Sequence, residues 1–140
     1  MGKILCATRG GEASYTTQDA VIALAKEQGD ELVFLYVADI SFLNNMSAPM
    51  VIDVESRLEK LGRFQLVMAQ ERAAEQGVAA STICHKGKVQ EELKNAARQE
   101  DVSLVVLGQP VGEESIFQSA SLKAFAAEIE AETGTPVRIL

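Results

Sequence analysis

The chain has 140 residues, of which 47% are hydrophobic and 24% charged, and its formal net charge is −7. These values predict a single globular domain over residues 1–140, long enough to bury a sizeable core. The acidic balance argues against nonspecific nucleic-acid binding, which needs a basic surface to neutralise phosphates. No apolar run approaches the ~20 residues that span a membrane, and the first residues show no secretory pattern, so we expect a cytoplasmic protein.

The predicted elements alternate between strands and helices along the whole chain. Short apolar runs indicate strands, whereas apolar residues at three- and four-residue spacing indicate helices. In chain order we predict a strand at 3–7, a helix at 14–28, a strand at 32–37, a helix at 54–76, a strand at 78–84, a helix at 88–99, a strand at 102–107, a helix at 119–132 and a strand at 136–140. This order predicts an α/β fold with a five-stranded parallel sheet, doubly wound in three α/β/α layers.

Some helix details can be stated in advance. Ser14 is the predicted N-cap of the first helix, whose inner face comprises Ala20, Val21, Leu24 and Ala25. The second helix follows an irregular segment, 38–53, which we interpret as a flap or a dimer contact. In that segment Met46 and Met50 either fill the core or contact a ligand or partner. The inner stripe of the second helix is predicted to be Val54, Leu58, Leu61, Gln65 and Met68.

Two glycine-rich turns follow predicted strands directly. Gly10-Gly11 comes after the first strand, and Gly108 and Gly112 come after the fourth. Ligands of open α/β sheets bind outside the carboxyl ends of the strands, where the strand order reverses, so these turns predict a small-molecule crevice. Gly10-Gly11 is equally consistent with a tight strand-to-helix turn.

The sequence offers no convincing catalytic set. His85 is the only histidine, which argues against a zinc site, and a surface or capping role is favoured for it over catalysis. No nucleophile, base and orienting group can be assembled, so we expect a protein that is not an enzyme, with weak ATP hydrolysis left open. Cys6 and Cys84 lack CxxC spacing and are expected to be buried, reduced thiols.

Four blocks of the sequence are informative when taken together. They are the turn Ala7-Thr8-Arg9-Gly10-Gly11-Glu12-Ala13-Ser14, the strand end Leu35-Tyr36-Val37, the stretch from Gly87 through Asp101 to Gly108, and the end Thr135-Pro136-Val137-Arg138-Ile139-Leu140. In their order and spacing these blocks resemble the universal stress protein family. The resemblance implies strand order 3-2-1-4-5, an adenine nucleotide alpha hydrolase-like fold, and a homodimer that often forms through the last strand, here Val137-Leu140. It also implies that ATP or AMP is a cofactor for some members and not for others.

The nucleotide-binding members of that family carry an acidic residue after the first strand and a Gly-x2-Gly-x9-Gly-(Ser/Thr) segment after the fourth. Here Arg9 stands at the acidic position, and it cannot accept a hydrogen bond from adenosine. Three residues separate the two glycines, including Pro110, which has no N–H for a phosphate. Ser119 or Ser121 stands near the last pair, where an N-cap role for Ser119 is favoured over phosphate binding.

Together these observations define a candidate crevice and a functional expectation. The candidate nucleotide-binding residues are Ala7, Thr8, Arg9, Gly10, Val37, Asp39, Gly108, Gly112, Ser119 and Ser121. Asp39 faces the crevice or caps a turn. We expect a stress-response domain that acts through homodimerisation and protein association, with an altered adenine-nucleotide site. The alternative is an ATP or AMP sensor that switches the 38–53 loop, and a nucleotide hydrolase is the third hypothesis.

Overall fold

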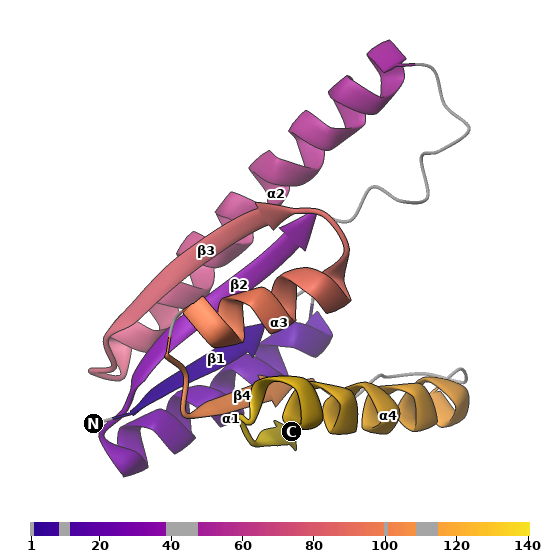
Figure 1. The fold of residues 1–140 in the computed structure, drawn as a ribbon. Coiled ribbons are helices and arrows are strands. Elements are labelled where there is room, and N and C mark those ends of the chain that lie inside the picture. Colours follow the sequence, from indigo (N-terminus) through magenta and orange to yellow (C-terminus); the bar gives the residue numbers. More distant parts are fainter. Residues whose placement is uncertain (1, 9–11, 39–47, 100, 109–114) are drawn as a thin grey trace.

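The computed structural model describes residues 2–8, 12–38, 48–99, 101–108 and 115–140. Its strands are β1 (Lys3–Ala7), β2 (Glu31–Ala38), β3 (Ala80–Lys86), β4 (Leu104–Leu107) and β5 (Val137–Ile139). Its helices are α1 (Glu12–Gln28), α2 (Ala48–Glu75), α3 (Val89–Gln99) and α4 (Ser115–Thr133). The strands form one parallel sheet in the order β3-β2-β1-β4-β5, which confirms the predicted fold class and strand order (Figure 1).

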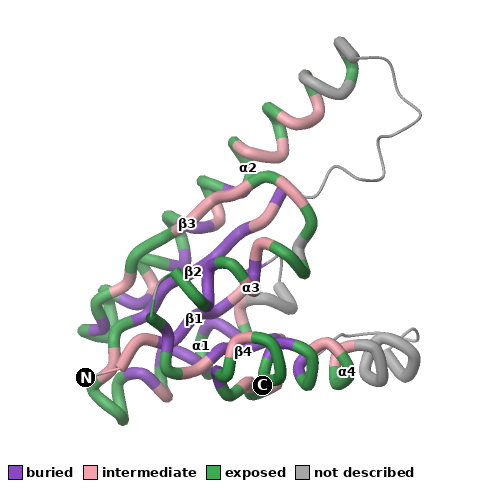
Figure 2. Tube along the Cα trace, viewed as in Figure 1, coloured by how far each residue is buried: buried purple, intermediate pink, exposed green. Residues whose placement is uncertain are grey.

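The sheet separates two hydrophobic cores. Successive strand residues point to opposite faces, so Ile4 and Cys6 of β1 face one core while Leu5 faces the other. The first core lies beneath α1 and α2, and the second lies beneath α3 and α4. Figure 2 shows the buried residues concentrated in the central strands, as expected when helices cover both faces of a parallel sheet.

The helix α2 differs most from its prediction. It begins at Ala48, so residues 48–53 are helical and not part of an irregular loop, and Met50 on it is exposed. Its first turns project beyond the end of the sheet (Figure 1).

The face of α2 that packs on the sheet is only partly the predicted one: Leu58 packs against the first core as expected, but two other members of the predicted stripe do not. Leu61 and Met68 are exposed, whereas Leu66, Ala69 and Ala73 are buried in the first core. Gly62 is buried as well and lies against the Tyr36 ring of β2. The helix therefore approaches the sheet through small side chains, which allow the two backbones to come close.

Two predicted N-caps are also wrong, because both helices begin earlier. α1 begins at Glu12 and α4 at Ser115, so Ser14 and Ser119 lie inside their helices. On α1, Val21 and Ala25 are buried as predicted, but Ala20 is exposed and Ile22 takes part in the core instead.

The ends of the same two helices lie close to their predictions: α1 ends at Gln28 as expected, and α4 ends at Thr133, one residue past the expected end. Gly29 follows α1 with φ +70°, and Gly134 follows α4 with φ +73°. A positive φ is the conformation for which helix-terminating glycines are used.

Polar contacts tie helices together on each face of the sheet. On one face, the Arg72 guanidinium of α2 pairs with Asp19 of α1 and lies 4.7 Å from the centroid of the Tyr15 ring. On the other face, the Lys94 ammonium of α3 pairs with Glu128 at 2.8 Å and with Glu132, both on α4. These contacts hold neighbouring helices in register over the two cores.

Candidate functional site

The strand order reverses between β1 and β4. From β1 the chain builds outward to β2 and β3, whereas β4 and β5 lie on the other side of β1. Cys6 pairs with Val106, so Thr8 and Gly108, two residues further on, stand at the same level just past the two strand ends. The two turns singled out in the sequence therefore begin next to each other, at the place where open α/β sheets bind ligands.

Thr8 lies on the α1 side of this edge and is hydrogen-bonded through both its backbone and its side chain. Its backbone N–H donates to the Leu35 carbonyl at 2.8 Å, and its hydroxyl accepts from Gln18 Nε2 at 3.0 Å. Thr8 is 5% exposed and Gln18 of α1 is 1% exposed. The Thr8 side chain thus anchors α1 to the end of β1 and leaves little of its own surface for a ligand.

The Gln18 amide is only half satisfied. Its Nε2 is occupied by Thr8, but its Oε1 is buried without a hydrogen-bond partner. A buried acceptor left unpaired is costly, and buried polar groups are usually paired with protein or with ordered water. With Thr8 and Thr17, Gln18 forms a buried polar cluster directly beneath the strand ends.

Gly108 is explained by close packing against that cluster. A Cβ built on Gly108 would lie 2.6 Å from Thr17 Oγ1 and 3.4 Å from Thr17 Cβ. Only a glycine lets the end of β4 come this close to α1. The open side of Gly108 is therefore the side away from Thr17, and the glycine has a structural role whatever binds in the crevice.

The opposite face of the same edge is apolar. Ala7 and Val37 are half-buried and pack against the second core, on the α3 and α4 side of the sheet. Ala7 pairs with Leu35, so Val37 stands two residues, or about 7 Å, further along β2 than the end of β1. This step gives the crevice a low apolar wall, a surface suited to the face of a planar ring.

The other candidate residues are not brought to the crevice by the described structure. Arg9, Gly10, Asp39, Gly112 and the loop residue Met46 lie outside the described residues. Ser119 and Ser121 fall in the second turn of α4, which begins at Ser115. The first four backbone N–H groups of a helix are the ones without intrahelical partners, so neither serine stands at the N-terminus of this helix.

Charged contacts at the end of β3 were missed by sequence reasoning. His85 Nδ1 lies 3.0 Å from Glu92 Oε2 of α3, which gives His85 a bridging role between strand and helix. The Lys86 ammonium lies 2.7 Å from both Glu55 and Glu59 of α2. Glu55 and Glu59 are one helical turn apart, and that spacing was the available signal for a shared cation.

The cysteines lie in the sheet and are both free thiols. Cys6 is fully buried in β1, and burial raises the pKa of its thiol to about 12. Cys84 of β3 is only half-buried, contrary to expectation; burial raises its pKa, and the nearby Arg63 charge partly opposes that shift. Neither thiol is primed as a nucleophile, because the reactive form is the thiolate. Across the part of the chain that the structure describes, no three His, Cys, Asp or Glu side chains gather to hold a metal ion.

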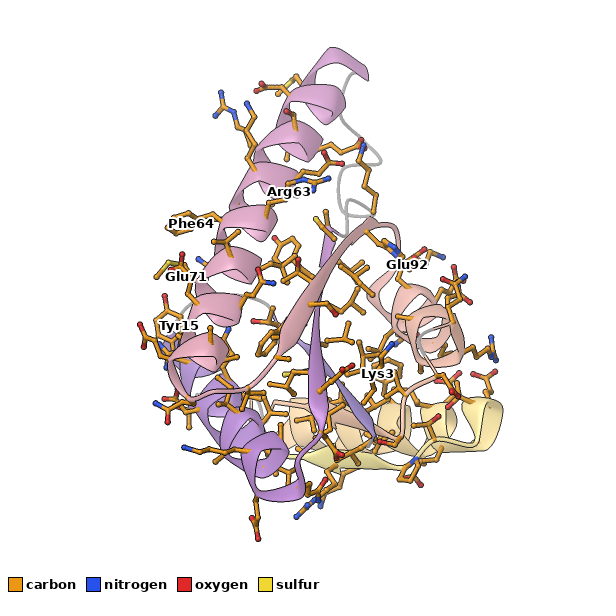
Figure 3. The ribbon with its side chains drawn as sticks, turned by 90° about the vertical axis from the view of Figure 1, so that its left-hand side faces the viewer. Lys3, Tyr15, Arg63, Phe64, Glu71 and Glu92 are labelled. Carbon is orange, nitrogen blue, oxygen red and sulfur yellow. The ribbon has the colours of Figure 1, made fainter. Side chains whose placement is uncertain are left out.

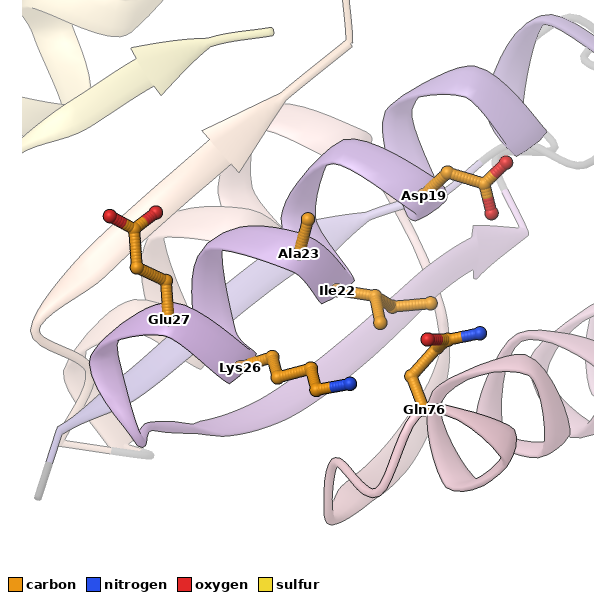
Figure 4. Close-up of a pocket in the computed structure, with 6 residues that line it drawn as sticks. All are labelled: Asp19, Ile22, Ala23, Lys26, Glu27 and Gln76. Atoms are coloured by element: carbon orange, nitrogen blue, oxygen red, sulfur yellow. The ribbon is translucent and has the colours of Figure 1, made fainter.

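A surface groove lies away from the crevice, between α1 and the end of α2 (Figure 4). Its volume is about 530 Å³, and it is lined by Asp19, Ile22, Ala23, Lys26, Glu27 and Gln76. The groove does not lie at the carboxyl edge of the sheet, because Lys26, Glu27 and Gln76 stand near the helix ends that lead into β2 and β3. It does not share the features that mark the end of β1 and β4.

The fold and the crevice together define a class of protein, the doubly wound α/β domains with a candidate ligand site at the strand-order reversal. The sequence profile of the Universal stress protein family matches residues 1–115. The chain is also 34% identical over 114 residues to Universal stress protein YxiE of Bacillus subtilis (strain 168), covering 76% of this chain and 77% of that protein. The chain belongs to the universal stress protein family.

Solved structures share the fold over essentially the whole chain. Universal stress protein UspA from Lactobacillus plantarum has a TM-score of 0.81 at 18% identity, covering 99% of this chain and 97% of that one. A universal stress protein in complex with cAMP has a TM-score of 0.71 at 19% identity, covering 99% and 96%. The family protein At3g01520 from Arabidopsis thaliana with AMP bound has a TM-score of 0.69 at 12% identity, covering 100% and 91%. In the described part of this chain, no helix is long and apolar enough to cross a membrane.

Proposed function

We propose that this universal stress domain binds an adenine mononucleotide weakly in the crevice between β1 and β4, and that it acts through protein association and not as a catalyst. The observation that carries the proposal is the convergence of Ala7, Thr8 and Gly108 at the strand-order reversal, beside the apolar step at Val37. Two proteins of the same fold are described with AMP and with cAMP. A stress-response role and a cytoplasmic location belong to the same proposal.

The sequence around the crevice favours a monophosphate over a triphosphate. Pro110 provides no N–H for a phosphate oxygen, and the two carboxylates of Glu113 and Glu114 follow Gly112 directly. Negative charge next to a phosphate-binding turn is unfavourable, and the penalty grows with the charge of the ligand. ATP is therefore expected to bind more weakly than AMP.

Thermal unfolding with and without ligand tests the proposal. AMP at about 100 times its Kd raises the free energy of unfolding by ~2.7 kcal/mol, which corresponds to a Tm increase of roughly 10 °C in a domain of this size. Titration calorimetry with AMP, cAMP and magnesium-ATP then ranks the ligands. Equal Tm values with and without each nucleotide, at millimolar concentration, would reject nucleotide binding.

A pair of variants locates the ligand. Val37→Glu places a charge on the apolar step and should abolish binding of AMP. Ile83→Glu is the matched control, because Ile83 is also half-buried over the second core but lies on β3, one strand further from the crevice. Loss of binding in both variants, or in neither, would place the ligand elsewhere.

The edge strand β5 supports a second candidate, a homodimer through the last strand. β5 pairs only with β4 among the described strands, so its outer edge is available. The Pro136 carbonyl accepts a hydrogen bond from β4, and the Leu140 N–H donates one to β4. Because alternate residues of a strand bond to opposite sides, the Val137 N–H points outward, and it donates to Glu130 Oε1 at 2.9 Å. That contact covers one edge donor, as isolated edge strands often require.

Glu130→Ala tests the strand-pairing dimer. If β5 pairs with a second copy, removing the Glu130 carboxylate frees the Val137 N–H and should tighten the dimer measured by sedimentation. A dimer that is unaffected by Glu130→Ala and persists after Arg138→Pro would show that β5 is not the contact.

The fold shortens the segment that the alternative hypothesis, an ATP or AMP sensor, requires to switch. Residues 48–53 form the start of α2, so the segment that a nucleotide would switch is 39–47. Limited proteolysis with and without AMP is its direct test, because ligand-dependent protection of this segment is what the alternative requires.

A further inference from the structure

The helix α2 carries a second apolar stripe on the side away from the sheet. Its members are Leu61 (51% exposed), Phe64 (59%), Val67 (49%) and Met68 (37%), which we call the outer stripe. The spacing of three and four residues places them on one helical face. Figure 3 shows Phe64 and Glu71 on the side of α2 that points away from β3.

The outer stripe is not needed for the fold. The inner face of α2 already packs on the sheet through Gly62, Leu66, Ala69 and Ala73. A helix that covers one face of a sheet needs a single apolar stripe, with polar residues opposite. Four large apolar side chains gathered on the outer face instead mark a surface that is used for association.

The charges that flank the outer stripe have opposite signs at its two ends. Arg57 and Lys60 precede the apolar residues, and Glu71 and Glu75 follow them. On a helical wheel all four lie within about 40° of Phe64, since each residue turns the helix by about 100°. One end of the face is thus basic and the other acidic, with the apolar residues between them.

This pattern is complementary to itself when reversed. If two copies of α2 cross antiparallel about a two-fold axis near Gln65, Lys60 of each copy meets Glu71 of the other. Arg57 then meets Glu75, and Phe64 meets Val67 and Met68. A two-fold contact requires such a self-complementary patch, because the same surface is presented by both copies.

We propose that the outer stripe of α2 is a docking surface for the outer stripe of a second copy of this chain, in an antiparallel two-fold arrangement. This contact is separate from the edge of β5 and does not depend on nucleotide binding. Arg57 also pairs with Asp53 on its own helix at 3.3 Å, so the Lys60–Glu71 pair is the cleaner determinant of the contact.

The size of the surface predicts a weak dimer. The stripe with its flanking charges runs from Arg57 to Glu75, about 27 Å along a helix about 10 Å wide. This footprint is well below the ~800 Å² per partner of a standard stable interface. We therefore expect dissociation in the micromolar range unless another contact adds to it.

Charge reversal tests the arrangement by sedimentation velocity over a concentration series. K60E places a carboxylate opposite Glu71 twice across the two-fold axis, and E71K places an ammonium opposite Lys60 twice. Each variant should therefore dissociate at least about tenfold more readily than the parent protein. In an equimolar mixture of the two variants, one copy carries two carboxylates and the other two ammonium groups, so both pairs become attractive and the association should return. The double variant K60E/E71K should also associate like the parent.

Phe64→Glu tests the apolar part, and Ala127→Glu is its control. Both positions are exposed on helices, but Ala127 lies on α4, across the sheet from α2. Dissociation by Phe64→Glu alone supports the proposal. A parent protein that stays monomeric at several hundred micromolar overturns it. Failure of the mixed variants to associate also overturns it, as does an association that Phe64→Glu leaves intact when the β5 edge is blocked by Arg138→Pro.

Discussion

Gly62 provides the sharpest test of how α2 packs on the sheet. A Cβ added at Gly62 would lie 2.2 Å from Cδ1, 2.4 Å from Cε1 and 2.9 Å from Cγ of Tyr36. The Tyr36 ring is 8% exposed on β2, between the sheet and α2. These atoms belong to the body of a packed ring and not to the tip of a flexible chain, so either the ring or the helix must move.

Two effects of the variant Gly62→Ala have opposite signs. In a helix interior, replacing glycine by alanine is worth ~1 kcal/mol of stabilisation. Forcing an extra carbon into a packed core typically costs 1–3 kcal/mol, and the short approach to Tyr36 puts this case near ~3 kcal/mol. The expected net result is a loss of ~2 kcal/mol, or a decrease in Tm of roughly 7 °C.

Chemical denaturation of Gly62→Ala, Tyr36→Ala and the double variant separates the two effects. Without the ring, the clash is gone and only the helix propensity remains. Gly62→Ala should therefore stabilise the Tyr36→Ala protein by ~1 kcal/mol, a reversal of sign. If Gly62→Ala is equally destabilising in both backgrounds, the close approach of α2 to Tyr36 is not the reason for the glycine.

Three further predictions address other contacts. Burial raises the pKa of the Cys6 thiol above its ordinary value near 9, so the unfolded chain loses this proton at a lower pH than the folded one. The free energy of unfolding should therefore decrease by ~1.4 kcal/mol per pH unit as the pH rises from about 9 towards 12. In a pH series of denaturation curves, the Cys6→Ala variant should lack this decrease. Arg72→Lys keeps the charge beside Asp19 but loses the planar contact with Tyr15, so thermal unfolding should report a loss of ~0.5–1 kcal/mol, and an unchanged Tm would contradict the stacking. Lys94→Gln should lower the Tm at low salt and have little effect near ~1 M salt, because the pairs with Glu128 and Glu132 are screened; a salt-independent difference would argue against an ionic role.

The fold was predictable because each strand carries its own local signal. The runs around Leu5, Phe34 and Val106 are apolar without alternation, and both faces of the corresponding strands are buried. Parallel strands with helical crossovers leave few arrangements, and the family resemblance supplied the strand order. Gly29 and Gly134 are local signals of the same kind, because a helix often ends at a residue with a positive φ and glycine adopts that conformation most readily.

The inner face of α2 was not predictable, because apolar periodicity does not say which apolar face is inside. The sequence places large residues at Leu61 and Met68 and small ones at Gly62 and Ala69, each only one position further along the helix. Choosing the larger residues was a choice of the greater hydrophobic area. The structure favours the smaller ones, because the bulky Tyr36 ring on β2 already fills the space between strand and helix.

The candidate site shows the same limit at the level of single side chains. That Thr8 and Gly108 stand together follows from the parallel pairing of β1 with β4, which could be expected once the family resemblance supplied the strand order. What their side chains do depends on α1: Gln18 holds the Thr8 hydroxyl, and Thr17 occupies the space that a side chain at Gly108 would need. A glycine in a turn beside a strand-order reversal therefore has two explanations: a ligand comes close to the backbone, or a helix does. The sequence does not distinguish between them. At Gly108 the helix alone is sufficient, so Gly108→Ala would disturb Thr17 whether or not a nucleotide binds. The step at Val37 is the more discriminating position for deciding what the crevice holds, because its side chain is only half-buried over the second core.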